Sequence, residues 1–151
     1  MDNIARQEPD PPQTLARAEA VAAAHYGQVA RRADRLLSNV LGVQWLGAVL
    51  IALWLTPRTW WGGESAVHIH VWAAVFLGGV LTLGPVLLAH SLPGRSLTRH
   101  VIAVAQMGMG ALLIHLTGGR IETHFHVFGS LAFLAFYRDW RVLVTASAVV
   151  S

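Results

Sequence analysis

Residues 99–120 read RHVIAVAQMGMGALLIHLTGGR, an apolar stretch with an arginine at each end and no charged residue between them. A helix needs about 17 to 25 apolar residues to cross the hydrocarbon core of a membrane, and this stretch has that length. Three further stretches of the chain lack charges, between Arg35 and Arg58, Glu64 and Arg95, and Glu122 and Arg138. The pattern predicts an all-α, polytopic helical membrane protein.

The composition supports this prediction. Hydrophobic residues make up 54% of the chain and charged residues 13%, and the mean hydropathy is +0.50. Soluble domains carry about 25% charged residues. The basic pI of about 10.6 could indicate a nucleic-acid partner. We expect none, because the arginines lie in the short connections where positive charge is typical of the cytoplasmic side of a membrane.

The chain divides into a leader, a helical arm and a membrane domain. Residues 1–12 contain Pro11-Pro12 and are predicted to be a disordered leader. Residues 13–35 show apolar side chains near helical spacing, which predicts a cytoplasmic amphipathic helix that runs into the membrane. The transmembrane domain, 36–151, is predicted to hold four complete spans and a partial fifth, at about 36–55, 68–90, 99–117, 124–137 and 142–151. The fifth reaches only about 15 Å, so we expect a longer protein.

The orientation follows from the distribution of arginines between the two sides. With four spans, nine arginines fall on the N-terminal side: Arg6, Arg17, Arg31, Arg32, Arg35, Arg95, Arg99, Arg138 and Arg141. Only Arg58 and Arg120 fall on the other side. Cytoplasmic connections carry the excess of arginine, so the N-terminus is predicted to be cytoplasmic.

Histidines gather on the opposite, outer side. This orientation places five of the eight histidines there, together with one carboxylate, and the candidate metal ligands are His68, His70, His115, His124, His126 and Glu122. Cysteine is absent, so a metal would be held by nitrogen and oxygen atoms. Zinc, copper and iron all accept such ligands. Ionisable groups at membrane depth often mark functional sites, although histidines near lipid headgroups can be simple interface residues.

The spacing of the histidines along the chain limits which of them can bind the same ion. Residues two apart on a continuous helix point about 200° away from each other, so one His-x-His pair can serve one ion only if the helix start is unwound. We therefore expect one ligand from each of three elements, with His115 and either His124 or His126 as the surest members. Two alternatives stay open: bis-histidine haem, since His100 and His115 share one span, and pH sensing by clustered imidazoles.

A few residues inside the spans are predicted to hold the helices together. Gln44 and Gln106 are expected to form hydrogen bonds between helices. Gly78-Gly79 with Gly84, and Gly108 with Gly110, are typical of surfaces where helices pack closely. Asp139 is expected to pair with an arginine near the inner face. No nucleotide-binding glycine loop, catalytic triad or pair of carboxylates is visible, so enzyme activity in this chain is not expected.

The stretch from His115 to Arg141, HLTGGRIETHFHVFGSLAFLAFYRDWR, carries a family resemblance. It resembles the multi-span N-terminal sensory region of certain bacterial sensor histidine kinases and chemoreceptor-like proteins. The Gln44-Trp45 pair and the His68-Ile-His-Val-Trp72 element are similar to the same family, and the resemblance covers residues 26–151.

The resemblance implies a sensory module of a two-component or chemotaxis protein in the bacterial inner membrane. Such a module would form a homodimer and pass its signal to a cytoplasmic transmitter domain. The chain contains no transmitter, so kinase activity is not carried over to it. The alternatives are a b-type cytochrome-like redox protein and a purely structural membrane anchor.

Overall fold

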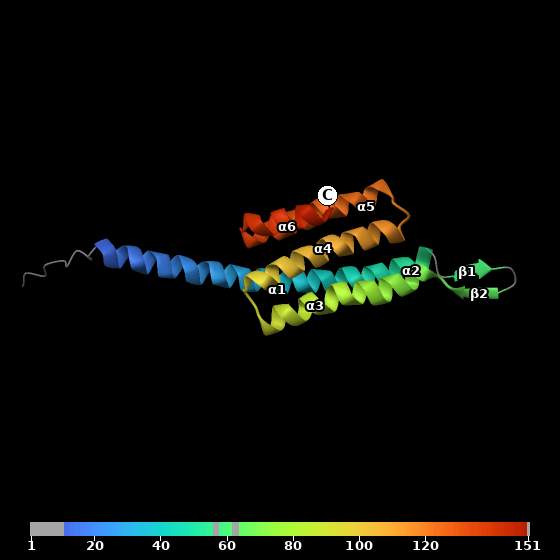
Figure 1. The fold of residues 1–151 in the computed structure, drawn as a ribbon, viewed down its shortest axis with the longest axis horizontal. Coiled ribbons are helices and arrows are strands. Elements are labelled where there is room, and N and C mark those ends of the chain that lie inside the picture. The colour runs from blue at the N-terminus through green and yellow to red at the C-terminus, as the bar shows by residue number, and fades with distance from the viewer. Residues whose placement is uncertain (1–10, 56–57, 62–63, 151) are drawn as a thin grey trace, which may run out of the picture.

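The computed structural model describes residues 11–55, 58–61 and 64–150, and in this part the chain is helical apart from one β-hairpin. The helices lie side by side in an elongated bundle, with the first helix extending beyond it at one end and the hairpin at the other (Figure 1). Three helical segments are long and apolar enough to cross a membrane, namely Gln13–Leu55, Ile69–Ser91 and Ser96–Leu116. The all-α fold and its membrane character therefore agree with the sequence.

Helix α1, Pro11–Leu55, is continuous over 45 residues. Prolines suit its first turn because the first amide groups of a helix have no partner within it. At about 1.5 Å per residue the helix is roughly 67 Å long, more than twice the thickness of a hydrocarbon core. The predicted arm, 13–35, and the predicted first span, 36–55, are thus parts of one helix. Of the predicted leader, 1–12, residues 1–10 lie outside the described residues.

The connection after α1 is a two-stranded antiparallel hairpin that the sequence analysis did not anticipate. Strand β1, Arg58–Trp61, pairs with β2, Glu64–Val67, in the register Arg58 to Val67 and Trp61 to Glu64. Helical structure resumes directly after β2 with α2, Ile69–Trp72, a π-helical turn η1, Ala73–Leu77, and α3, Gly78–Ser91. Together they match the predicted span of 68–90.

Helix α4, Ser96–Leu116, is the centre of the bundle and contacts α1, α3, α5 and α6. More than half of its apolar window, 56%, is buried, against 28% in α1 and 33% in Ile69–Ser91. Ile102 and Met109 are fully buried on it, and Met107 is 2% exposed. The methionines therefore serve as packing residues in the core.

The last elements are shorter than the predicted spans. Helix α5, Ile121–Leu134, has 14 residues and is extended by the 3₁₀ turn η2, Ala135–Tyr137. Helix α6, Trp140–Val150, turns back and packs against α4 and α5. Because α5 is about 21 Å long, it falls below the length of a span on its own. Among the described residues three helices have spanning length, and the predicted span 124–137 corresponds to the shorter α5 and η2.

Two turns set the direction of α5 and α6. Helix α4 ends in two glycines with positive φ, Gly118 at 71° and Gly119 at 76°, whose amide groups donate to the carbonyls of His115 and Ile114. Left-handed glycines of this kind close helix ends at little steric cost. Arg138 adopts φ 54° between η2 and α6 and is the one non-glycine residue with positive φ in the described part of the chain.

Helices α1 and α3 approach closely at the predicted glycine pair. A β-carbon added to Gly78 would lie 2.8 Å from Cδ1 of Trp45, and one added to Gly79 would lie 3.4 Å from the same ring system. The indole Nε1 of Trp45 donates a 3.1 Å hydrogen bond to the carbonyl of Ala74. The prediction of close-packing surfaces is confirmed at Gly78-Gly79 and at Gly108, where an added β-carbon would lie 3.0 Å from Leu81, but it is wrong at Gly84, which has no such neighbour within 4 Å.

Candidate functional site

The start of α2 brings both histidines of the first His-x-His pair together. His68 is extended, with φ −64° and ψ 144°, and its Nδ1 accepts a 3.1 Å hydrogen bond from the backbone amide of His70. The helix therefore begins only at Ile69, and the two imidazole rings lie 4.2 Å apart in an edge-to-face arrangement. Both histidines of one His-x-His pair can bind the same ion only where the helix start is unwound, and the start of α2 meets this condition.

His115 joins this pair from the last turn of α4. Its ring lies 5.0 Å from the ring of His70, at an angle of 70°. His68 and His70 are half-buried, whereas His115 is exposed. We call these three residues the outer histidine cluster. It joins the ends of two helices that are predicted to cross the membrane.

The second His-x-His pair does not join the cluster. His124 is exposed and its Nδ1 donates to the carbonyl of Arg120 at 3.0 Å, within its own helix. Glu122 is exposed in the first turn of α5. The structure thus brings His115 to His70, and the expected grouping of His115 with His124 or His126 is not what the packing produces.

The outer histidine cluster does not form a complete metal site in its present arrangement. Within residues 11–55, 58–61 and 64–150, no three histidine or carboxylate side chains are arranged so that they could hold a metal ion as they stand. A metal would therefore have to draw the rings together. His115, the one exposed member, is the ring with the fewest neighbours to hold it in place.

His126 takes part in a polar chain inside the bundle. Its Nε2 lies 3.0 Å from Nε2 of Gln44 on α1, and its Nδ1 lies 3.3 Å from Oγ of Ser130 one turn later on α5. Nε2 of Gln106 on α4 donates to the same Oγ at 3.1 Å. Both glutamines therefore bond across helices, as the sequence predicted. Their Oε1 atoms are buried without a hydrogen-bond partner.

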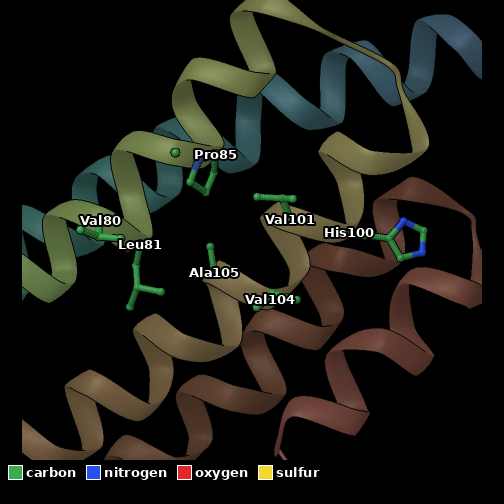
Figure 2. Close-up of a pocket in the computed structure, with 8 residues that line it drawn as sticks. Val80, Leu81, Pro85, His100, Val101, Val104 and Ala105 are labelled. Atoms are coloured by element: carbon green, nitrogen blue, oxygen red, sulfur yellow. The ribbon is translucent and has the colours of Figure 1, made fainter.

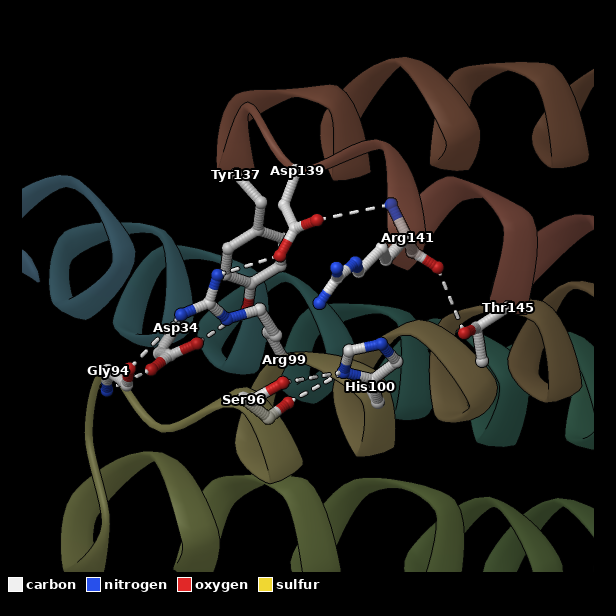
Figure 3. A network of polar contacts seen from close by, with 9 residues as sticks. All are labelled: Asp34, Gly94, Ser96, Arg99, His100, Tyr137, Asp139, Arg141 and Thr145. Atoms are coloured by element: carbon white, nitrogen blue, oxygen red, sulfur yellow. Dashed lines mark hydrogen bonds and ion pairs between the residues drawn. The ribbon is translucent and has the colours of Figure 1, made fainter. Parts of the chain in front are cut away.

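The end of the bundle that the arginine distribution predicts to face the cytoplasm, called the inner end below, is held by a buried carboxylate that the sequence pattern does not single out. Asp34 on α1 is 0% exposed and accepts from the hydroxyl of Tyr137 at 2.7 Å and from the amide of Gly94 at 2.6 Å. Figure 3 shows Asp34 between the α3–α4 turn and η2. One side chain thus ties α1 to two turns that come much later in the chain.

An ion pair closes the same end. Nη1 of Arg99 on α4 lies 2.9 Å from Oδ2 of Asp139, and Nη2 of Arg99 donates to the carbonyl of Gly94 at 3.3 Å (Figure 3). Oδ1 of Asp139 accepts from the amide of Arg141 at the start of α6. The predicted pairing of Asp139 with an arginine is confirmed, and the partner comes from α4.

The remaining membrane histidines belong to single helices. Nδ1 of His90 and Nδ1 of His100 lie 2.8 and 2.7 Å from carbonyls four residues earlier in α3 and α4. His100 borders an apolar groove of about 340 Å³ in which Val80, Leu81 and Pro85 of α3 face Val101 and Ala105 of α4 (Figure 2).

Comparison with known proteins does not identify a family for this chain. No protein-family model, no curated protein and no solved structure matches this chain.

Proposed function

We propose that this chain is the membrane-embedded sensory input module of a bacterial signalling protein and that its outer histidine cluster binds a transition-metal ion. The observation that carries the proposal is the contact of His68, His70 and His115 at the meeting point of α2 and α4. Imidazole is the commonest protein ligand for zinc, copper and iron. His68 and His70 lie at the start of α2 and His115 lies at the end of α4. The distances between the three imidazoles therefore change when these two helix ends move relative to each other.

The proposal includes a fourth crossing of the membrane by α5 and η2. At the outer end, Oγ1 of Thr123 lies 2.8 Å from Oγ1 of Thr117 in the α4–α5 turn. At the inner end, Tyr137 reaches Asp34 and Asp139 reaches Arg99. The segment thus begins and ends beside the two ends of α4, and this favours a short, complete crossing. With four crossings the arginine distribution places the N-terminus in the cytoplasm.

Metal binding would act on the packing of α4. Drawing His115 toward His70 pulls the outer end of α4 against the start of α2, and α4 also contacts α1, α5 and α6. Arg99, near the other end of α4, is bonded to the α5–α6 turn and to the α3–α4 turn. A shift of α4 would therefore reach the hydrogen bonds of Asp34 at the inner end and, through them, the cytoplasmic part of α1. A homodimer and a cytoplasmic transmitter domain complete this proposal.

Metal binding by the purified full chain tests the proposal. The chain, stripped with EDTA and placed in lipid nanodiscs, is titrated with Zn²⁺ and with Cu²⁺ by calorimetry. We expect one site per chain in the wild type and at least a tenfold loss of affinity in His70→Gln and His115→Gln. His124→Gln is the matched control, since it removes an exposed outer histidine outside the cluster, and should bind as the wild type does.

The alternatives give different results in the same preparations. A b-type cytochrome predicts a Soret absorption band in protein purified from cells grown with a haem precursor, lost in His115→Gln. A purely structural anchor predicts that the three variants bind metal no differently from the wild type. Equal affinity in His115→Gln, His124→Gln and wild type would contradict the metal site.

A further inference from the structure

A basic surface on α1 lies where this helix enters the inner end of the bundle. Gln28, Arg31, Arg32 and Arg35 line a shallow cavity of about 260 Å³, and the three arginines are exposed. Their spacing of three, four and seven residues from Gln28 places all four side chains on one face of the helix. We call this cavity the arginine pocket. It combines three positive charges with one amide within two turns.

The charges of the arginine pocket are not neutralised by carboxylates. Asp34 lies in the same turn, but its two oxygens point into the bundle, where they accept from Gly94 and Tyr137. The one ion pair between side chains in the described residues joins Arg99 to Asp139. The arginine pocket therefore has an excess of positive charge and calls for an anionic ligand. Guanidinium groups bind phosphate through paired N–H donors.

Arg31 is held in place by the packing of its aliphatic stem. A β-carbon added to Gly94 would lie 3.0 Å from Cγ of Arg31, so the stem lies directly on the α3–α4 turn. The guanidinium group lies beside Gly27, where an added β-carbon would be 3.4 Å from Nη1. A side chain restrained in this way loses less conformational entropy when it binds a ligand.

An apolar cavity adjoins the arginine pocket on the membrane side. It has a volume of about 200 Å³ and shares Arg32 with the arginine pocket. Its other lining residues are Val29, Ala33, Leu36, Leu37 and Phe136. Leu36 and Leu37 follow Arg35 along α1 in the direction of the bundle, and Phe136 comes from η2. The two cavities overlap along α1, over residues 28–35 and 29–37, so they lie side by side on the helix, and the apolar one extends further along it to Leu36 and Leu37.

We propose that these adjoining cavities bind one anionic phospholipid of the inner leaflet, with its phosphate in the arginine pocket and an acyl chain against Leu36 and Phe136. A headgroup in the arginine pocket would have an apolar surface directly beside it, and that surface extends along α1 to Leu36 and is closed by Phe136. The charge excess selects an anionic headgroup, because basic residues near a membrane surface attract anionic lipids. The site rests on the cytoplasmic orientation of the N-terminus but not on metal binding.

Lipid binding by the full chain tests this site. The protein is reconstituted in nanodiscs of phosphatidylcholine containing an increasing fraction of phosphatidylglycerol, and bound lipid is measured by native mass spectrometry after release from the discs. We expect a tightly retained phosphatidylglycerol in the wild type. The triple variant Arg31→Gln/Arg32→Gln/Arg35→Gln should retain it at least tenfold less.

The matched control removes the same charge from the same face of the membrane. Arg95→Gln/Arg138→Gln/Arg141→Gln leaves the arginine pocket intact and should retain phosphatidylglycerol within twofold of the wild type. Phe136→Ser should weaken retention of the lipid about fivefold, while binding of inorganic phosphate stays unchanged. Equal losses in the two triple variants would overturn the site in favour of general surface attraction. Saturation of the wild type by millimolar inorganic phosphate, with no preference for the lipid, would overturn the lipid as the ligand.

Discussion

Asp34 on α1 accepts a 2.7 Å hydrogen bond from the hydroxyl of Tyr137, which lies 103 residues later in the chain. The second oxygen of Asp34 accepts from the amide of Gly94, so the carboxylate joins three parts of the bundle at its inner end. Helix α1 continues from this point out of the bundle. Any rearrangement that separates α1 from the α3–α4 turn or from η2 must break a hydrogen bond to Asp34.

Replacing Asp34 should therefore destabilise the bundle. Asp34→Ala leaves the amide of Gly94 and the hydroxyl of Tyr137 without their buried acceptor, and each unsatisfied group costs about 1 to 3 kcal/mol. We expect a loss of about 3 kcal/mol in the free energy of unfolding, measured by denaturation with SDS in mixed micelles. Tyr137→Phe should cost about 1 kcal/mol, because it removes one of the two donors.

Glu19→Ala is the control for Asp34→Ala. Glu19 is an exposed carboxylate on the same helix, outside the bundle. Its replacement should leave the denaturation midpoint unchanged. A similar midpoint for Asp34→Ala and Glu19→Ala would mean that the buried carboxylate does not hold the inner end together.

The contact of Trp45 with Gly78 predicts a position-specific effect of a single methyl group. Gly78→Ala places a β-carbon 2.8 Å from the indole, a distance that forces α1 and α3 apart. Such overpacking costs about 1 to 3 kcal/mol. Gly47→Ala on the facing helix α1 is the control, because its β-carbon would meet no atom outside its own stretch of helix within 4 Å.

The expected outcomes are opposite in sign. Gly47→Ala should raise the free energy of unfolding by up to about 1 kcal/mol, since alanine has the higher helix propensity. Gly78→Ala should lower the free energy of unfolding and should change the fluorescence of Trp45. Stabilisation by both substitutions would show that α1 and α3 are not in close contact at this level.

The hydrogen bonds of Ser130 predict that replacing Ser130 and replacing Gln106 change the free energy of unfolding by different amounts. Ser130→Ala removes the acceptor of Gln106 Nε2 and the partner of His126, so it leaves a buried donor unsatisfied and should cost about 1 kcal/mol. Gln106→Leu removes that donor together with its unpartnered Oε1 and keeps a similar volume. It should be neutral or stabilising when measured by the same SDS denaturation. A larger loss in Gln106→Leu than in Ser130→Ala would mean that Oε1 of Gln106 has a partner in the membrane.

The sequence predicted the helical elements well where charge and hydropathy define them. The span predicted at 68–90 is helical over Ile69–Ser91, and the span predicted at 99–117 is helical over Ser96–Leu116. Charge-free stretches mark these helices because a buried or lipid-facing charge costs free energy wherever the neighbouring helices lie. The hairpin of β1 and β2 was missed, because four-residue strands leave too short a pattern to detect.

The contacts within the candidate site depend on packing that the sequence does not encode locally. His115 is close to His124 along the chain, but it lies against His70, because α4 packs beside the start of α2. Asp34 stands among Arg31, Arg32 and Arg35, a pattern typical of an exposed ion pair, yet it is fully buried. Its one sequence signal is its place on the face of α1 that also carries Leu37 and Leu41, which are buried as well.

The proposed four crossings can be tested directly because the chain has no cysteine. Single cysteines are introduced at three exposed positions: Ile121 at the start of α5, Ser91 at the end of α3 and Trp140 at the start of α6. Intact cells are treated with a membrane-impermeant maleimide. Ile121→Cys should be labelled, because it lies on the outer side, whereas Ser91→Cys and Trp140→Cys should be labelled only after the membrane is opened. The Trp140 position decides whether α5 crosses. Trp140 follows Asp139, which pairs with Arg99 at the inner end, so we expect Trp140→Cys to be protected from the maleimide in intact cells. Labelling of both Ile121→Cys and Trp140→Cys from outside would mean that α5 does not cross and that the chain has three crossings.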